Sequence, residues 1–152
     1  MRTIIHQMKF LGRDDIADRL GHYSGSLLKR TIYGKRFDAI IPVPLHPTRV
    51  RERGYDQNLA LAMAISNEVG IKVINNLITR RKNTRPQSRL SDTERSSNLE
   101  DAFGRNVAYN SKIPKSVLLI DDVIHSGATV AGCVALLHNM KIENIHIVSV
   151  CG

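Results

Sequence analysis

The stretch Val117-Leu-Leu-Ile-Asp-Asp-Val-Ile-His-Ser-Gly-Ala-Thr129 decides the fold. Its apolar beginning predicts a buried strand, and the small residues after the two acids predict a turn over 121–126 that opens into a helix over 127–140. A parallel strand delivers its last residues to the carboxyl edge of a sheet. Asp121 and Asp122 are therefore expected where open α/β folds bind ligands.

The two halves of this motif suit different chemical groups. Free N–H groups at the start of the helix suit a phosphate, together with the hydroxyls of Ser126 and Thr129, and Gly127 lets the backbone approach closely. Two neighbouring carboxylates accept hydrogen bonds from a sugar diol and favour magnesium. A ribose 5-phosphate satisfies both halves. An unrelated α/β protein with an acidic strand end is the alternative, but the complete order of strand, acids, loop and helix favours the sugar phosphate.

Strand and helix patterns alternate along the rest of the chain. The expected elements are a helical region at 4–31, strands at 38–44, 71–78, 116–120 and 143–150, and a helix at 57–68. The first region contains helical stretches at 4–10 and 14–31, and Gly12, Gly21 and Gly25 predict that it is broken into two or three short helices. Asp56 is the expected N-cap of the helix at 57–68, whose inner stripe is Leu59, Ala60, Met63 and Ala64. The alternation predicts an α/β fold, with a mainly parallel central sheet and helices on both faces.

One long segment, 80–98, carries many basic and few large apolar side chains. A loop of this length inside a compact domain is usually functional or disordered, so we interpret it as a flexible flap. The 152 residues fit a single domain over 1–152, in which 1–37 form a helical N-terminal segment, or hood.

Composition narrows the choice of partners. The 22 basic and 14 acidic side chains leave a net charge of +8, which favours phosphorylated metabolites, nucleic acid or another anionic surface. There is neither an apolar run long enough for a transmembrane helix nor a secretory leader, so no membrane span and a cytoplasmic location are expected. The two cysteines, Cys133 and Cys151, are too far apart to suggest a structural zinc site.

The opening motif resembles the signature of type I phosphoribosyltransferases that binds 5-phosphoribosyl-1-pyrophosphate (PRPP). In that family the two acids contact the ribose hydroxyls and the loop cradles the 5′-phosphate. The resemblance assigns Asp121 and Asp122 to the ribose and to catalysis, with Mg²⁺ held through PRPP and not directly by the protein. The residues assigned to the ribose phosphate are Asp121, Asp122, Val123, His125, Ser126, Gly127, Ala128 and Thr129. His125 replaces a residue that is usually threonine or small, so a hydroxyl is lost there.

Two further stretches, Ile41-Pro-Val-Pro-Leu-His-Pro47 and Arg51-Glu-Arg-Gly-Tyr-Asp-Gln-Asn58, resemble the signature of the ComF family, a phosphoribosyltransferase-like group linked to natural competence. Downstream pairs such as Leu90-Ser91 extend the likeness, which runs from about His6 to the C-terminus. The expected pyrophosphate and flap residues are Pro44, Leu45, His46, Arg49, Arg51, Arg53, Arg80, Arg81 and Lys82. Guanidinium groups bind phosphate oxygens in pairs, although a solvated loop explains any single arginine equally well.

ComF proteins commonly begin with a cysteine-rich zinc ribbon, whereas this chain begins at the helix that would follow it. We interpret the chain as a short form, or as one whose true start lies upstream, and carry over no zinc site.

Two functions are open at this stage. The resemblance implies a PRPP-binding protein that acts in DNA uptake, with single-stranded DNA as a partner. A basic flap is compatible with a groove that follows phosphates, but three Phe, four Tyr and no Trp argue against a stacking platform. The alternative is an enzyme of nucleotide salvage or biosynthesis that transfers ribose 5-phosphate from PRPP to an acceptor. No residue identifies that acceptor, and a homodimer is left open.

Overall fold

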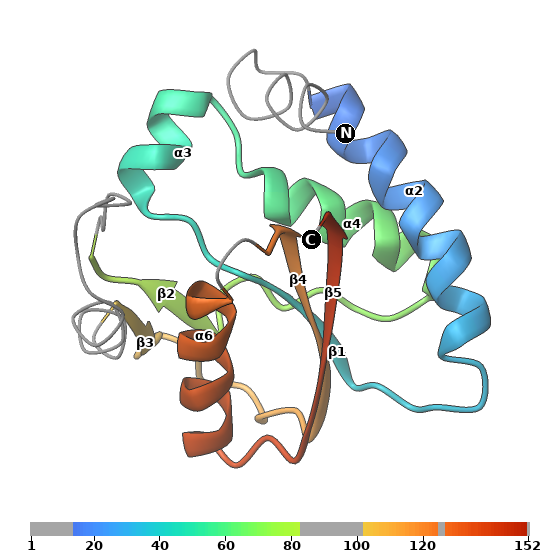
Figure 1. Cartoon of the computed structure of the whole chain (residues 1–152). Coiled ribbons are helices and arrows are strands. Elements are labelled where there is room, and N and C mark those ends of the chain that lie inside the picture. The colour runs from blue at the N-terminus through green and yellow to red at the C-terminus, as the bar shows by residue number, and fades with distance from the viewer. Residues whose placement is uncertain (1–13, 83–101, 125–126, 152) are drawn as a thin grey trace.

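The structure, a computed structural model, describes residues 14–82, 102–124 and 127–151. Its elements are α2 (Asp14–Thr31), β1 (Ala39–Pro42), α3 (Pro47–Arg53), α4 (Gln57–Val69), β2 (Ile78–Arg80), β3 (Phe103–Arg105), β4 (Ser116–Val123), α6 (Ala128–Asn139) and β5 (Asn144–Cys151) (Figure 1). The start of the hood, 1–13, and the flap from 83 to 98 lie outside the described residues. Within them, no helix is both long and apolar enough to cross a membrane.

A parallel sheet in the order β1-β4-β5 forms the centre of the molecule. The middle strand is β4, in which the apolar residues 117–120 are fully buried. On the free side of β1, Ile40 forms a parallel bridge with Val73. The sheet confirms the predicted α/β fold. The strand expected at 71–78 was wrong, because that region contributes only this bridge before β2 begins.

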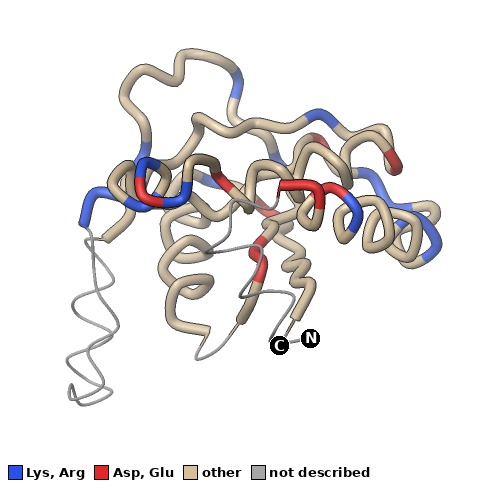
Figure 2. Tube along the Cα trace, turned by 90° about the horizontal axis from the view of Figure 1, so that it is seen from above, with Lys and Arg blue, Asp and Glu red and all other residues tan. Residues whose placement is uncertain are grey.

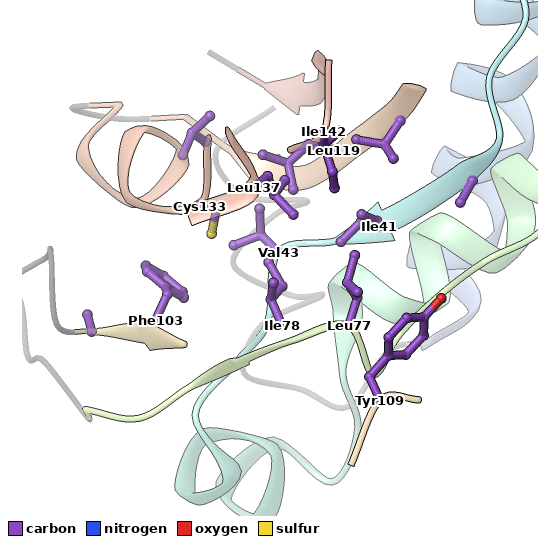
Figure 3. Close-up of a cluster of buried hydrophobic side chains, with 14 residues drawn as sticks. Ile41, Val43, Leu77, Ile78, Phe103, Tyr109, Leu119, Cys133, Leu137 and Ile142 are labelled. Atoms are coloured by element: carbon purple, nitrogen blue, oxygen red, sulfur yellow. The ribbon is translucent and has the colours of Figure 1, made fainter. Parts of the chain in front are cut away.

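Helices cover both faces of the sheet, as predicted (Figure 1). Because side chains alternate along a strand, Leu118 and Ile120 of β4 pack with α2 and α4 on one face. Leu119 points to the opposite face, where it packs with Leu137 and Cys133 of α6 (Figure 3). Two apolar cores therefore cover the two faces of the sheet.

The breaks expected at Gly21 and Gly25 were wrong, because α2 is a single continuous helix of 18 residues; the stretch at 4–10 and Gly12 lie outside the described residues. Gly21 and Gly25 lie on the face that meets α4. A Cβ on Gly21 would lie 2.5 Å from the Cβ of Ala64, and a Cβ on Gly25 would lie 2.7 Å from that of Glu68. The glycines permit close helix packing, and that packing outweighs their low helix propensity.

The helix α4 begins where predicted, with the Asp56 carboxylate accepting a hydrogen bond from Leu59 N at 3.0 Å. Its buried stripe differs from the expected one. Met63 is 50% exposed, and the residues that face inward are Gln57, Asn58, Leu61, Ala62, Ala64 and Ile65. Two amide side chains therefore occupy buried positions at the start of this helix.

The strands β2 and β3 form an antiparallel pair that encloses the flap segment. Arg80 pairs with Phe103 in the ladder, and its guanidinium carbon lies 5.4 Å from the centre of that aromatic ring. Arg81 lies over Gly104, at a place where any Cβ would collide with it. The pair was not expected from the sequence. It holds the described residues on either side of the flap next to each other, and Arg81 N also donates to Ala102 O at 2.7 Å.

The carboxylate of Asp38 joins the beginnings of β1 and β4. Its Oδ2 accepts hydrogen bonds from Lys115 N at 2.7 Å and Ser116 N at 3.0 Å, and these bonds lower the pKa of Asp38. The folded-state pKa thus lies below the unfolded value of about 3.9. The stabilisation is therefore fully present above that value and is lost as the pH falls through the folded pKa.

Asp38→Asn should consequently lower the free energy of unfolding at about pH 7, and its effect should shrink as the pH falls below about 4. Urea denaturation of both proteins across this range measures the difference. An effect of equal size at both ends of the range would contradict this interpretation.

Candidate functional site

The strand order of the sheet reverses between β1 and β4, at the carboxyl ends of these two strands. After β1 the chain forms α4 and returns to the outer side of β1 at Val73, whereas after β4 it forms α6 and continues into β5 on the other side. Open α/β sheets bind ligands in the crevice at such a point. The acid pair lies in the last part of β4, beside the loop that follows β1.

The strand β4 runs through both acids to Val123, so the turn predicted over 121–126 begins later than expected. Asp121 is 6% exposed and Asp122 is 4% exposed. Adjacent strand residues point to opposite faces, and the charges of the two acids act on different groups. The charge of Asp121 acts on Arg80, and that of Asp122 acts on Arg53.

Two side-chain amides from α4 hold this acid pair. Asn58 Nδ2 donates to Asp121 Oδ1 at 3.1 Å, and Gln57 Nε2 donates to Asp122 Oδ2 at 3.2 Å. Both amides are 1% exposed. Gln57 and Asn58 belong to the stretch that resembles the ComF signature, but no role in the site was predicted for them. An amide pair on the buried side of a helix was the available indication, since such side chains are mostly exposed.

Asn58 also bridges β1 and β4 where their ladder stops. Val43 N donates to Ile120 O at 2.8 Å, so in a regular parallel ladder the next bond would run from Asp122 N to Val43 O. Instead, Asn58 Nδ2 donates to Val43 O at 2.9 Å and Asn58 Oδ1 accepts from Asp122 N at 3.0 Å. The carboxamide of Asn58 replaces one hydrogen bond of the ladder and joins the carboxyl ends of the two strands.

Two of the predicted arginines, Arg53 and Arg80, lie near the acids. Burial lowers the pKa of Arg53 and that of Arg80, and the nearby carboxylates oppose this change. Arg49 lies close enough for its positive charge to lower both values further. A polyanion would relieve this repulsion between like charges. Seen from above, several acidic segments lie towards the middle of the trace and basic ones mostly towards its outside (Figure 2).

The other predicted basic residues take less central positions. Arg51 is exposed and donates to Thr48 Oγ1 at 3.3 Å, while Arg49 also forms an ion pair with Glu52 at 3.0 Å. Arg81 and Lys82 are exposed at the beginning of the flap.

The loop after β1 leads into α3, a helix that the sequence analysis did not expect. His46 caps it, with Nδ1 accepting from Thr48 N at 3.3 Å, and Pro47 occupies its first position. Pro44 and Leu45 line a cavity of about 190 Å³ together with Asp56 and Thr79. Burial raises the pKa of Asp56, although hydrogen bonds from its own helix oppose the change. The loop is therefore shaped by a cap and two prolines.

The predicted phosphate loop ends at the start of α6. Gly127 is the N-cap, with a φ of 71° that suits glycine, and it has no side chain to satisfy the first N–H groups of the helix. Ala128 and Thr129 are the first helical residues. His125 and Ser126 lie outside the described residues. The described part of this loop thus has the features of an anion site, a left-handed glycine followed by uncapped amides.

Comparisons with known proteins extend these observations. No family model matches the chain. Competence protein F of Haemophilus influenzae is 35% identical over 150 residues, which cover 97% of this chain and 66% of that protein. DNA utilization protein YhgH of Escherichia coli O157:H7 is 30% identical over 157 residues, which cover 99% of this chain and 66% of that protein. The chain thus spans about two thirds of the length of these relatives.

Solved structures share the fold. A glutamine PRPP amidotransferase from B. subtilis superposes with a TM-score of 0.56 at 15% identity, covering 89% of this chain and 26% of the other. A hypoxanthine phosphoribosyltransferase from Staphylococcus aureus superposes with a TM-score of 0.52 at 14% identity, covering 90% of this chain and 62% of the other. With the crevice, the acid pair and the sequence relatives, these likenesses show that the chain belongs to the ComF family and has the type I phosphoribosyltransferase fold.

Proposed function

We propose that the chain binds PRPP in the crevice between the ends of β1 and β4. One observation carries this proposal. Two buried carboxylates, each accepting a hydrogen bond from a side-chain amide, lie at the point where the strand order reverses. Carboxylates there suit the donors of a sugar diol. The uncapped start of α6 suits the 5′-phosphate.

The diphosphate of PRPP would lie towards the loop after β1. Arg49, Arg53 and Arg80 supply positive charge on that side, and the resemblance assigns the loop residues Pro44 to His46 to the same group. Paired guanidinium contacts neutralise phosphate oxygens more effectively than a single ammonium group. The electrostatic repulsion among these arginines favours an anion between them.

Magnesium fits this site through the ligand. Among the described residues, no group of three or more His, Cys, Asp and Glu side chains could hold a metal ion. Mg²⁺ retains several waters and is commonly held by substrate phosphates with few protein ligands. The chain would therefore bind Mg–PRPP through the phosphates, and the metal would neutralise charge on the diphosphate.

The relatives bear names that place them in competence and DNA utilization. We propose that this chain acts in the same setting, as a PRPP-binding protein in the use of incoming DNA. Transfer of ribose 5-phosphate is the enzymatic alternative: a nucleophile bonds to C1 while the C1–O bond to pyrophosphate breaks, and the nucleophile loses its proton. The crevice would position these groups and neutralise charge, with little need for a general base.

Calorimetry with PRPP, with and without magnesium, tests the central proposal. We expect binding that is stronger with Mg²⁺, because the metal offsets the charge of the diphosphate. Ribose 5-phosphate should bind more weakly because it lacks that group. If neither compound binds with or without the metal, the proposed function is wrong.

Two further measurements separate the DNA setting from the enzyme. A gel shift with single-stranded oligonucleotides should show retardation that weakens as salt rises, because phosphate contacts release counterions. Release of pyrophosphate from PRPP in the presence of a panel of nucleobases reports transfer. Retardation without release favours the first function, and release with one base favours the second.

A further inference from the structure

Gln57 occupies an unusual position for its side chain. It is the first residue of α4 and is only 1% exposed, whereas glutamine is mostly found at protein surfaces. It ranks among the largest fully buried side chains of the described chain. Nothing in the packing of α4 requires an amide there, since an unbranched apolar side chain of similar length would fill the same volume.

The hydrogen bonds of Gln57 are incomplete. Nε2 donates to Asp122 Oδ2 at 3.2 Å, while Oε1 is buried and accepts no hydrogen bond from the residues that the structure describes. The orientation of the amide follows from chemistry, because a carboxylate oxygen requires a donor opposite it. Burying an acceptor without a donor lowers stability, so this residue reduces the stability of the fold in order to make one contact with Asp122.

The neighbouring amide cannot make that contact. Asn58 donates to Val43 O and to Asp121 Oδ1, and it accepts from Asp122 N. Its donors are thus committed to β1 and to the first acid. The Asp122 carboxylate accepts a hydrogen bond from Gln57 of the same helix. Asn58 links the ends of β1 and β4, whereas the Nε2 bond of Gln57 contacts one carboxylate, that of Asp122.

We propose that Gln57 is a positioning residue, which acts through Asp122 to hold that carboxylate in the orientation that binds the ribose. The inference rests on the proposed binding of PRPP and deepens it. A carboxylate can accept up to about four hydrogen bonds, so the bond from Gln57 leaves Asp122 able to accept from a ligand hydroxyl. Fixing the rotamer before binding removes an ordering cost from the binding step.

Gln57→Met tests the proposal, because methionine is unbranched and similar in length. The affinity for ribose 5-phosphate should fall roughly tenfold, which corresponds to about 1.4 kcal/mol. The affinity for inorganic pyrophosphate, measured in the same buffer with magnesium, should be unchanged. The urea midpoint should stay the same or rise, because the buried Oε1 is removed. Asn67→Ala, at an exposed position of the same helix, is the control and should change none of the three.

The possible results separate clearly. Unchanged affinity for ribose 5-phosphate in Gln57→Met, with a wild-type protein that binds it, overturns this inference alone. Parallel loss of both ligands together with a lower urea midpoint also overturns it, because Gln57 would then have a structural role. A wild-type protein that binds neither ribose 5-phosphate nor PRPP overturns the proposed function, and this inference with it.

Discussion

Replacing Asp121 and Asp122 together by asparagine should abolish PRPP binding while the chain stays folded. Each carboxylate offers charged acceptors to the ribose hydroxyls, and a hydrogen bond to a charged group contributes about 1.5–3 kcal/mol. Loss of two such bonds corresponds to a decrease in affinity of about 10²–10⁴-fold. Asparagine preserves the shape of both side chains and can still accept from the two α4 amides. Calorimetry with Mg–PRPP measures the change.

A control variant keeps this experiment specific. Glu143 is an exposed acid whose carboxylate pairs with Lys115 at 2.9 Å, at the amino end of the sheet. Glu143→Gln removes a negative charge far along the strands from the crevice, and it should leave PRPP affinity unchanged. If the double asparagine variant binds PRPP as the wild type does, Asp121 and Asp122 do not bind the ribose.

Asn58→Leu should destabilise the protein by about 2–4 kcal/mol, because it leaves buried polar groups without their partner. Val43 O would lose the donor that takes the place of the missing ladder bond, and Asp122 N would lose its acceptor Asn58 Oδ1, although it still donates to Asp121 Oδ1 at 3.1 Å. Leucine fills the volume but makes neither bond. Chemical denaturation of the variant and the wild type measures the difference.

The matched substitution on the same helix is Asn67→Leu. Asn67 is exposed, so its replacement should change the free energy of unfolding by no more than about 0.5 kcal/mol. If Asn58→Leu proves as stable as Asn67→Leu, the side chain is not the link between β1 and β4 that the hydrogen bonds indicate.

Local patterns were enough to predict the central motif. The apolar run, the acid pair and the glycine before α6 are contiguous, so their order along the chain already specifies a strand, its carboxyl edge and a helix start. The cap at Asp56 was predicted for the same reason, since it depends on residues three positions apart. In both cases the interacting groups are neighbours in sequence.

What the sequence did not reveal depends on contacts between distant segments. Gln57 lies 65 positions before Asp122 and Asn58 lies 63 before Asp121, so neither partner can be identified from local spacing. The same reason explains Gly21, whose role is set by Ala64 on another helix and not by its own propensity. The short helix α3 was missed because its 7 residues, most of them polar or charged, make about two turns and show no hydrophobic period.

The pairing of β2 with β3 has a consequence for how this part of the chain can vary. Arg80 pairs with Phe103, and Arg81 N donates to Ala102 O at 2.7 Å, so the described residues on either side of the flap lie next to each other. The entropy of joining such ends grows only slowly with length, by about 0.6 kcal/mol for each doubling. Insertions and deletions between β2 and β3 can therefore accumulate during evolution with little loss of stability for the rest of the domain.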